Sequence, residues 1–457
     1  MTDNAYTKQP NDFTQNIGNG SYSTADSYVK QVWDGRYTGI RMCNQLLENI
    51  DRVPDLDPEL KKRYIGEAKV LRAYNYYELY TKFGDVPYTT KVLSIKESMS
   101  IARTDRATVI ANMLADLDEV INGNYLPTSY DADNKGRITR WAAMAIKAKI
   151  YLFEGNWTQV KNITSTIMTE GGFRLFGSYA GLFEIANEYN SEVILDAQYR
   201  PTSREHQMMY AFLPPSLGGY SQLSPLQELV DSYIMLDGKT IRETGTSFDE
   251  SNPYANRDPR LKATVMYTGN SYTLADGTEV VINCEKGEGK DGYGVGSDCS
   301  ATGYYIKKYW DNTYRATLYS GLNPILIRYA DILLMNAEAL AELGELDKTA
   351  WDATIKPIRD RAGFTLASAV EFPEGASKDK LIEIVRNERR SELALEGHRH
   401  KDIIRWRIAD DVLNGWCHGL KTNEVVGTDN GYVRVENRAF NANKHYLWPI
   451  PQAERDL

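Results

Sequence analysis

The sequence contains few of the residues and patterns that mark the common classes of enzyme. Of its 457 residues only 4 are cysteines and 5 are histidines. No two cysteines form a CxxC pair, and no histidines have the HExxH or i, i+4 spacing of a catalytic zinc site. A GxSxG elbow and an SxxK motif are also missing, although a Ser/His/Asp triad built from distant residues stays open. The residues therefore give no positive evidence for catalysis, and we expect no cofactor.

Long apolar runs and basic blocks are missing as well. The best candidate for a membrane span, residues 325–343, is interrupted by Arg328, Asp331 and Glu338. The formal net charge is −9, from 53 Lys+Arg against 62 Asp+Glu. Because nucleic acids are bound mainly through basic surfaces, a nucleic-acid partner is not expected. The share of hydrophobic residues, 42%, and of charged residues, 25%, is that of an ordinary globular protein.

A glycine-rich segment lies between Cys284 and Cys299, and a loop-closing disulfide between these two cysteines stays open. Within it, Gly287, Gly289 and Gly292 satisfy GxGxxG. A dinucleotide site also needs a helix directly after the glycines, to place its N-terminus at the pyrophosphate. The residues that follow cannot start a helix, so we interpret the segment as a flexible loop. A structural calcium held by oxygen atoms of acidic, carbonyl-rich loops stays open too.

Helical periodicity dominates the two outer parts of the chain. Apolar residues recur at intervals of three and four in the following predicted helices: 24–50, 58–83, a helix capped by Asp105, 139–154, 157–168, 324–343, 349–362 and 378–396. The helices around Gly155 and those around Gly344 are predicted to stack as helical hairpins. Near Gly155, small residues such as Ala142, Ala145 and Ala148 let a partner helix approach closely. Such pairs are typical of tetratricopeptide-like repeats.

The middle of the chain has a different character. Short strand-like runs alternate with loops rich in Gly, Pro, Ser and Asn, at residues 192–198, 261–267, 279–284 and 304–310, with a short helix near 225–235. The last ordered run, 446–451, is a short extended segment. We predict a mainly α fold: a tetratricopeptide-like framework of helical pairs at 24–170 and 324–406, with a loop-rich insertion at 171–323 that contains short strands. The whole chain, 1–457, is predicted to form one domain.

Two features indicate ligand recognition and internal ion pairing. The chain has 31 tyrosines and 8 tryptophans, more aromatic surface with hydrogen-bonding groups than a helical scaffold needs, and this suits amphipathic ligands. In the C-terminal helices, Arg328 lies one turn from Asp331, and Arg389 one turn from Glu392. We interpret these charges as structural ties between helices, with a phosphate site as the lesser alternative.

Six segments of the chain form an ordered set of motifs. The segments are Gly66 to Pro87 (GEAKVLRAYNYYELYTKFGDVP), Arg257 to Leu261 (RDPRL), Ile327 to Ala339 (IRYADILLMNAEA), Ile358 to Gly363 (IRDRAG), Arg386 to Trp406, and Trp448 to Pro451 (WPIP). Together they extend over nearly the whole chain. In this order they resemble the SusD/RagB-like family of surface nutrient-capture lipoproteins of Bacteroidota.

This resemblance implies four tetratricopeptide-like helix pairs and a loop-rich part that builds the ligand site. It implies a non-enzymatic protein of the outer-membrane surface that captures oligosaccharides or polysaccharides and delivers them to a SusC-like TonB-dependent transporter. Two family features are not in the sequence: the lipidated cysteine at the mature N-terminus and a short tail after the final proline. The expected lipid anchor therefore precedes this sequence.

The resemblance also suggests which aromatic residues contact the ligand. Tyr88 follows the turn after which the family often places such a residue, and Tyr220, Tyr272, Tyr293 and Trp310 are the best candidates in the loop-rich middle. A sugar ring has an apolar face and a rim of hydroxyl groups, which an aromatic platform with a few polar groups matches. The alternatives are a peptide-binding member of the family and a glycoside-acting enzyme. The sequence specifies neither the glycan nor its linkage.

Overall fold

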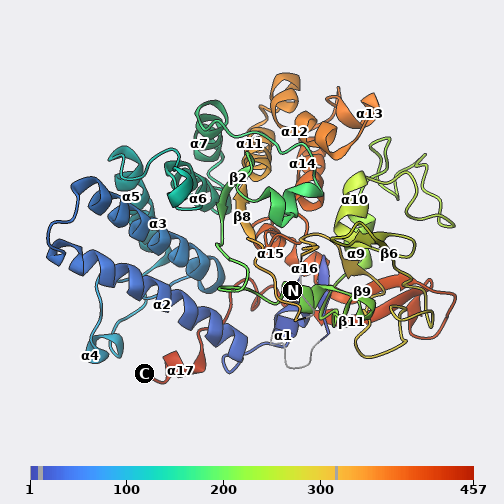
Figure 1. Ribbon diagram of the computed structural model, residues 1–457, viewed down its shortest axis with the longest axis horizontal. Helices are drawn as coiled ribbons and strands as arrows, with labels where there is room; N and C mark the ends of the chain where they lie inside the picture. Colours follow the sequence, from blue (N-terminus) through green and yellow to red (C-terminus); the bar gives the residue numbers. More distant parts are fainter. Residues whose placement is uncertain (1, 9–13, 314–316) are drawn as a thin grey trace. The chain divides into compact units, whose positions relative to one another are not determined.

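Helices make up most of the regular structure in the computed structural model, which describes residues 2–8, 14–313 and 317–457 (Figure 1). The predicted mainly α fold is confirmed. Contacts within the chain divide it into two compact units. The helical unit comprises Gly20–Gly172, Ile404–Ala409 and Asn441–Leu457, and the mixed unit comprises Met1–Asn19, Phe173–Ile403 and Asp410–Phe440.

The helical unit contains the first group of predicted helices. Its elements are α2 (Ser27–Asn49), α3 (Pro58–Phe83), α4 (Ile95–Ser98), α5 (Arg106–Asn122), α6 (Arg140–Phe153), α7 (Trp157–Glu170) and α17 (Gln452–Arg455), with short 3-10 turns at Ile50–Arg52 and Ala132–Asn134. Figure 1 shows α2, α3, α5 and α6, coloured blue to teal, side by side. Polar side chains fix where the helices begin: Asp57 caps α3, Asp105 caps α5 and Thr139 caps α6, each accepting a hydrogen bond from the first turn.

Two glycines end helices that then reverse direction. Gly155 has a φ of 68° between α6 and α7, and Gly344 has a φ of 73° between α11 (Tyr329–Leu343) and α12 (Lys348–Ala362). This left-handed conformation is strained for other residues, so glycine permits the tight reversal. The helices on either side of each glycine pack against each other. The two predicted helical hairpins are therefore confirmed.

The mixed unit combines helices with short strands. Besides α11 and α12 it contains α1 (Thr14–Asn19), α8 (Met208–Phe212), α9 (Gln227–Ser232), α10 (Pro259–Thr264), α13 (Ala367–Val370) and α14 (Lys378–Glu392), with 3-10 turns at Gly181–Phe183, Ile185–Asn187 and Pro215–Leu217. Helices α15 (Arg399–Arg405) and α16 (Ala409–Val412) lie where the chain passes between the units. The helices α11, α12 and α14 pack on one another.

All strand pairs of the described residues are antiparallel. The pairs are β1 (Ala5–Thr7) with β3 (Leu223–Pro225), β2 (Val193–Asp196) with β8 (Ile325–Arg328), β4 (Val265–Met266) with β7 (Tyr305–Ile306), and β5 (Ser271–Thr273) with β6 (Glu279–Val281). A three-stranded sheet has the order β10 (Thr428–Asp429), β11 (Tyr432–Ala439) and β9 (Asn414–Lys421).

Two predictions of local structure need correction. In the predicted strand run 261–267, residues 261–264 are helical because Asp258 caps α10 and Pro259 occupies its first turn, and only Val265–Met266 form a strand, β4. The predicted helix 324–343 starts only at Tyr329, since residues 325–328 form the strand β8, which pairs with β2. The hairpin of β9 and β11, which belongs to the mixed unit, was not predicted.

The structure also groups the helices differently from the predicted framework. Helices α11, α12 and α14 belong to the same unit as the loop-rich segment, while α2 to α7 belong to the other unit. That the whole chain acts as one domain stays a prediction. No helix among the described residues has the length and apolar character that a membrane span requires.

Buried ion pairs tie the helices of the mixed unit together. Glu392, with a side chain that is 0% exposed, pairs with Arg328 at 2.6 Å, with Arg260 at 2.9 Å and with Arg361. Arg389 bridges Asp331 at 2.6 Å and Asp402 at 2.9 Å. The structural interpretation of these arginines is thus confirmed.

Candidate functional site

The structure brings two of the predicted aromatic residues together, Tyr272 and Trp310. Their rings lie 5.0 Å apart, and the indole Nε1 of Trp310 donates a 2.9 Å hydrogen bond to the Thr273 carbonyl. Tyr272 is completely buried, and its hydroxyl donates to the Ile306 carbonyl at 2.7 Å. The prediction that Tyr272 contacts a ligand therefore requires correction: with no open face, this ring supports Trp310 from inside.

Tyr293 and Tyr220 lie near the same part of the mixed unit. Tyr293 and Trp310 are partly buried and pack against the hydrophobic core cluster that contains Tyr272. Tyr220 is 38% exposed and stacks on Tyr210 with ring centroids 4.2 Å apart. Tyr210 packs against that cluster too. The loop-rich candidates thus share one core, although their rings emerge from different loops.

Tyr88 belongs to the helical unit. Its ring lies 4.5 Å from that of Tyr76, and the Tyr76 hydroxyl donates to the Thr89 carbonyl at 3.1 Å. Burial raises the pKa of Tyr88 to about 12, so its hydroxyl stays protonated at neutral pH. A ligand role for Tyr88, Tyr220, Tyr293 and Trp310 stays a prediction.

A hollow in the mixed unit is larger than the two others described below, and we call it the large hollow. Its volume is about 810 Å³. The residues that line it are Gln227, Phe248, Glu250, Ser251, Pro253, Tyr254, Thr268, Cys284, Glu285, Lys286, Glu288, Tyr304, Leu420, Lys421, Thr422, Asn423, Glu424 and Tyr432. Aromatic rings and polar side chains of both charges therefore meet in one open cavity.

Two irregular segments form the walls of this hollow. One is the glycine-rich loop, which contributes residues 285–288, and the other is the end of β9 with the loop after it. In the glycine-rich loop a Cβ on Gly292 would lie 2.2 Å from the Glu288 carbonyl oxygen, so only glycine permits this turn. A Cβ on Gly419 of β9 would lie 2.5 Å from the Thr302 carbonyl oxygen. Close backbone contact therefore holds β9 against the core.

Tyr254 and Tyr432 offer the aromatic surface of the hollow. Tyr254 stacks on Tyr267 with centroids 3.9 Å apart and an interplanar angle of 14°, and it also lines the hollow. The Lys421 ammonium lies over the Tyr432 ring at 5.5 Å. Burial raises the pKa of Tyr254 to about 12, and its hydroxyl lies 3.3 Å from that of Tyr304.

The polar groups of the hollow fall into two classes. Lys421 pairs with Glu250 at 2.8 Å, and Lys286 pairs with Glu424. In contrast, the side chains of Glu285, Glu288 and Asn423 form no hydrogen bond or ion pair with other described residues. Free carboxylate and amide groups beside an aromatic face can bind the hydroxyl groups of a polyol ligand. The large hollow is thus the best candidate site.

His418 connects the β9 strand to α9 and β10 next to this hollow. Its Nδ1 lies 2.8 Å from the Glu228 carboxylate of α9, and its Nε2 lies 3.1 Å from the Asp429 carboxylate of β10. The hydrogen bond with Glu228, assisted by the one with Asp429, raises the pKa of His418 above its usual 6.5 despite partial burial. Across the sheet, Arg434 also pairs with Asp429.

We expect the thermal stability of the hairpin to depend on His418 and pH. Because the folded-state pKa is raised, the stabilisation is fully present below the unfolded value near 6.5 and is lost as pH rises through the folded-state pKa. Melting temperatures of wild type and His418→Gln, recorded from about pH 5 to about pH 9, should converge at the alkaline end. Glu228→Gln, which keeps an acceptor but removes the charge, should make the melting temperature less dependent on pH. If the melting temperature of His418→Gln depends on pH as steeply as that of wild type, this assignment is refuted.

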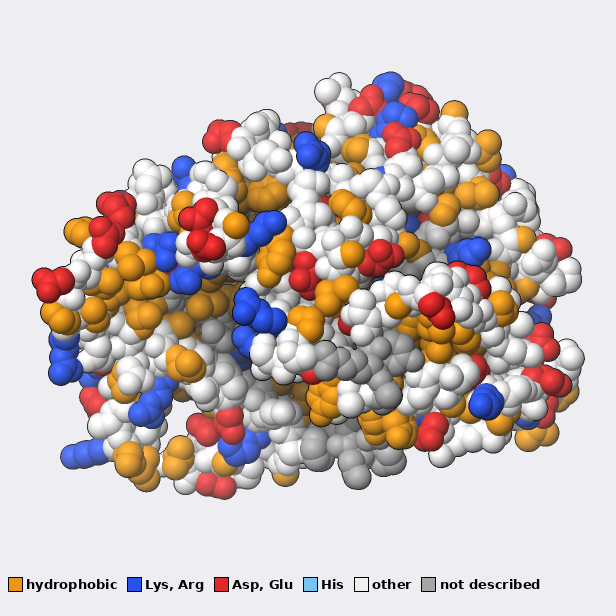
Figure 2. Space-filling model, viewed as in Figure 1, with side chains coloured by type: hydrophobic (Ala, Val, Ile, Leu, Met, Phe, Trp, Pro, Cys, Tyr) orange, Lys and Arg blue, Asp and Glu red, His pale blue; other side chains and the backbone are white. Residues whose placement is uncertain are grey.

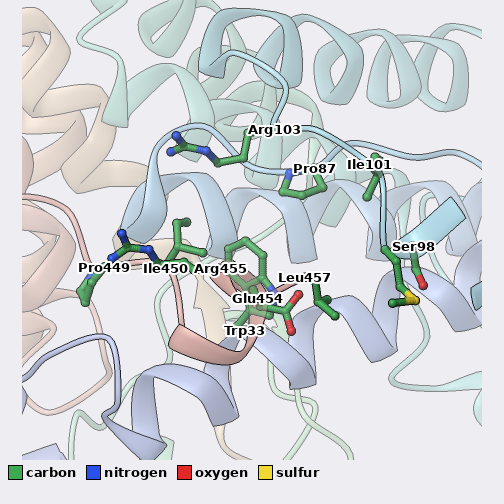
Figure 3. A pocket seen from close by; sticks show the side chains of 11 residues that line it. Trp33, Pro87, Ser98, Ile101, Arg103, Pro449, Ile450, Glu454, Arg455 and Leu457 are labelled. Carbon is green, nitrogen blue, oxygen red and sulfur yellow. The ribbon is translucent and has the colours of Figure 1, made fainter. Parts of the chain in front are cut away.

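A second hollow lies in the helical unit, where the C-terminal segment meets the loop after α3. Its volume is about 510 Å³, and Figure 3 shows Pro87 and Arg103 on one wall with Glu454 and Leu457 on the other. The aromatic ring that it contains, that of Trp33, is only 3% exposed and packs on Phe83. This hollow therefore offers less aromatic surface to a ligand than the large hollow does.

The described part of the chain contains no group of three or more His, Cys, Asp or Glu that could hold a metal ion. A calcium ion bound largely through carbonyl oxygens stays a prediction. Cys284 and Cys299 are buried free thiols, so the disulfide that the sequence left open is not formed. Instead the Cys299 thiol donates to the Lys290 carbonyl at 3.2 Å.

Sequence reasoning missed Tyr254 and Tyr432 as site residues. Tyr254 follows the turn residues Asn252 and Pro253, and Tyr432 follows Gly431 at the start of β11. An aromatic residue directly after a turn is a signal that could have identified both tyrosines as candidate ligand contacts. The same signal was used for Tyr88. The hairpin itself was not predicted, however, so Tyr432 could not be placed beside Tyr254.

Comparison with known proteins gives consistent matches along the whole chain. The model of the SusD family matches residues 182–457, and a model described as "Starch-binding associating with outer membrane" matches residues 1–152. A SusD-like protein of Formosa agariphila is 27% identical over 410 residues, which cover 84% of this chain and 71% of the relative.

Solved structures agree with these sequence matches. A SusD-like carbohydrate-binding protein of Bacteroides fragilis has a TM-score of 0.89 and 29% identity, and the match covers 100% of this chain and 90% of the other. A laminarin-binding SusD-like protein has a TM-score of 0.73 and 25% identity, with coverage of 99% and 90%. The arrangement of helices and loops described above is thus similar to that of proteins that carry carbohydrate-binding descriptions.

Proposed function

The chain belongs to the SusD family, and on this premise we propose that it is a non-enzymatic protein that binds oligosaccharides or polysaccharides. The large hollow is the proposed glycan site. Tyr254 and Tyr432 supply apolar faces for sugar rings, with Glu285, Glu288 and Asn423 for their hydroxyl groups. Among the predicted residues, Tyr88, Tyr220, Tyr293 and Trp310 are proposed as further contacts along a longer chain.

One observation carries this proposal: an aromatic face and unpaired polar groups occupy the same open cavity. Tyr254 is held flat by Tyr267 at 3.9 Å, so the platform is ordered before a ligand arrives. An ordered platform reduces the entropy cost of binding. Each such contact contributes modestly, so we expect dissociation constants from about micromolar to about millimolar. Weak binding suits a protein that must release its ligand again.

We further propose that the protein acts at the outer membrane and delivers its ligand to a SusC-like TonB-dependent transporter. The description of the family model for residues 1–152 supports association with the outer membrane. The family resemblance supports the transporter and a surface-exposed lipid anchor. Co-purification of the tagged chain with a co-expressed SusC-like TonB-dependent transporter would test the partner.

A glycan and peptide array with the purified chain tests the proposed binding. We expect oligosaccharides to bind, peptides to give only background signal, and chromatography of the bound glycans to show no shortened products. Binding of peptides alone would favour a peptide-binding member of the family. Shortened products that persist after further purification would indicate a glycoside-acting enzyme instead.

A further inference from the structure

A third hollow, in the helical unit, has an unusual charge. Its volume is about 490 Å³, and we call it the basic hollow. The residues that line it are Tyr80, Thr81, Arg106, Phe153, Ile404, Arg405, Arg407, Ala442, Asn443, Lys444, Tyr446 and Leu447. They come from the ends of α3 and α6, the start of α5, the end of α15 with the segment after it, and the loop before the C-terminus.

The charged residues that line the basic hollow are all cations, although the chain as a whole has a net charge of −9. Figure 2 shows acidic and basic side chains interspersed over most of the face in view. Arg106 pairs with Glu154, which does not line the hollow. For the Arg407 guanidinium and the Lys444 ammonium, no carboxylate partner lies among the described residues. The hollow therefore has a positive electrostatic potential, because ion pairs within the protein do not neutralise these cations.

Arg407 lies beside an aromatic ring of the same hollow. Its guanidinium lies over the Tyr446 ring, 4.2 Å from the centroid. A guanidinium is attracted to the face of a ring without using its N–H donors. Its forked donors match the paired oxygens of a carboxylate or a sulfate ester. The contact with Tyr446 therefore leaves the donors of Arg407 available.

From these observations we infer that the basic hollow binds the acidic group of a charged sugar, a uronate or a sulfate ester. Arg407 and Lys444 bind the anion, and the rings of Phe153 and Tyr446 contact the apolar face of the sugar. That the ligand is a sugar rests on the proposed function. That the ligand carries an anionic group rests on the basic hollow alone. The large hollow differs, because Glu250, Glu285, Glu288 and Glu424 outnumber Lys286 and Lys421 there.

An array of matched glycan pairs tests this inference: uronate oligosaccharides beside their methyl esters, and sulfated galactans beside their desulfated forms. We expect at least one acidic glycan to bind about 10-fold or more tightly than its neutral partner, as charge-assisted hydrogen bonds imply. Whether the uronates or the sulfated galactans bind identifies the anion. Isothermal titration of that glycan with Arg407→Gln/Lys444→Gln should show a loss of about 10- to 100-fold.

The matched control is Lys348→Gln/Lys380→Gln, which removes two exposed positive charges that line none of the three hollows and should keep the preference for the acidic glycan. Arg407→Lys should retain part of the affinity, and thermal melts should resemble wild type, because Arg407 and Lys444 are exposed. Equal binding of the acidic glycan and its neutral partner would overturn the inference. Complete displacement of the acidic glycan by inorganic sulfate at equal concentration would overturn it too. If no glycan binds at all, the proposed function fails; if only neutral glycans bind, the inference fails alone.

Discussion

Glu392→Ala is expected to lower the free energy of unfolding by about 3 to 5 kcal/mol, because it leaves buried guanidinium groups without their counter-charge. Arg260 and Arg328 both have side chains that are only 1% exposed and pair with Glu392. Burial opposes ionisation of Glu392, but Arg361, Arg328 and Arg260 outweigh it and hold the pKa of this carboxyl well below its usual range. Urea denaturation of wild type and variant measures the loss.

The control for this prediction is Glu383→Ala on the same helix, α14. The Glu383 side chain is 61% exposed and pairs with Lys380 at 2.9 Å, so its removal should cost less than about 1 kcal/mol. Glu392→Gln, which keeps the shape but not the charge, should fall between the two. A loss from Glu392→Ala no larger than that from Glu383→Ala would mean that the arginines find other partners.

The stabilisation that Glu392 provides through its ion pairs depends on pH. Since the folded-state pKa of Glu392 is depressed, its stabilisation is present above the unfolded value near 4.5 and is lost as pH falls through the folded-state pKa. Wild type should therefore lose stability on acidification more steeply than Glu392→Gln does.

Tyr254→Ala is expected to weaken glycan binding by about 1 to 3 kcal/mol, or about 5- to 150-fold, through loss of the aromatic contact and its buried area. Tyr254 lines the large hollow and lies flat on Tyr267. Isothermal titration with a glycan identified on the array measures the change. Tyr254→Leu, which preserves more packing on Tyr267, should lose affinity with a smaller change in melting temperature.

Tyr319→Ala is the matched control, since Tyr319 is 40% exposed in the same unit but does not line the hollow. Trp310→Ala and Tyr293→Ala complete the series. Trp310 also donates a hydrogen bond to Thr273 and packs on Tyr272, so its removal should lower the melting temperature as well. Loss of affinity with Trp310→Ala and unchanged affinity with Tyr254→Ala would place the glycan on Trp310 instead.

The helices were predictable because their signals are local. Residues 58–83 were predicted as a helix and form α3 with the same bounds, since Asp57 caps its start and the conformation of Gly84 ends it. The glycine-rich segment was correctly interpreted as a loop. In contrast, the hairpin of β9 and β11 was missed, because its strands carry two register shifts and lack a regular alternation of buried residues.

The sequence by itself determined the family, the helical pairs and the pairing role of the C-terminal arginines, because caps, periodicity and motif order depend on neighbours along the chain. Only the tertiary structure decided which aromatic rings stay open and which cations stay unneutralised. Tyr272 and Tyr254 are both loop tyrosines by sequence, yet one is completely buried and the other lines a hollow. Likewise Arg407 and Tyr446, 39 positions apart in the sequence, form one cation–π pair. Exposure and electrostatic potential are sums over contacts between distant segments, and a single sequence does not contain those contacts.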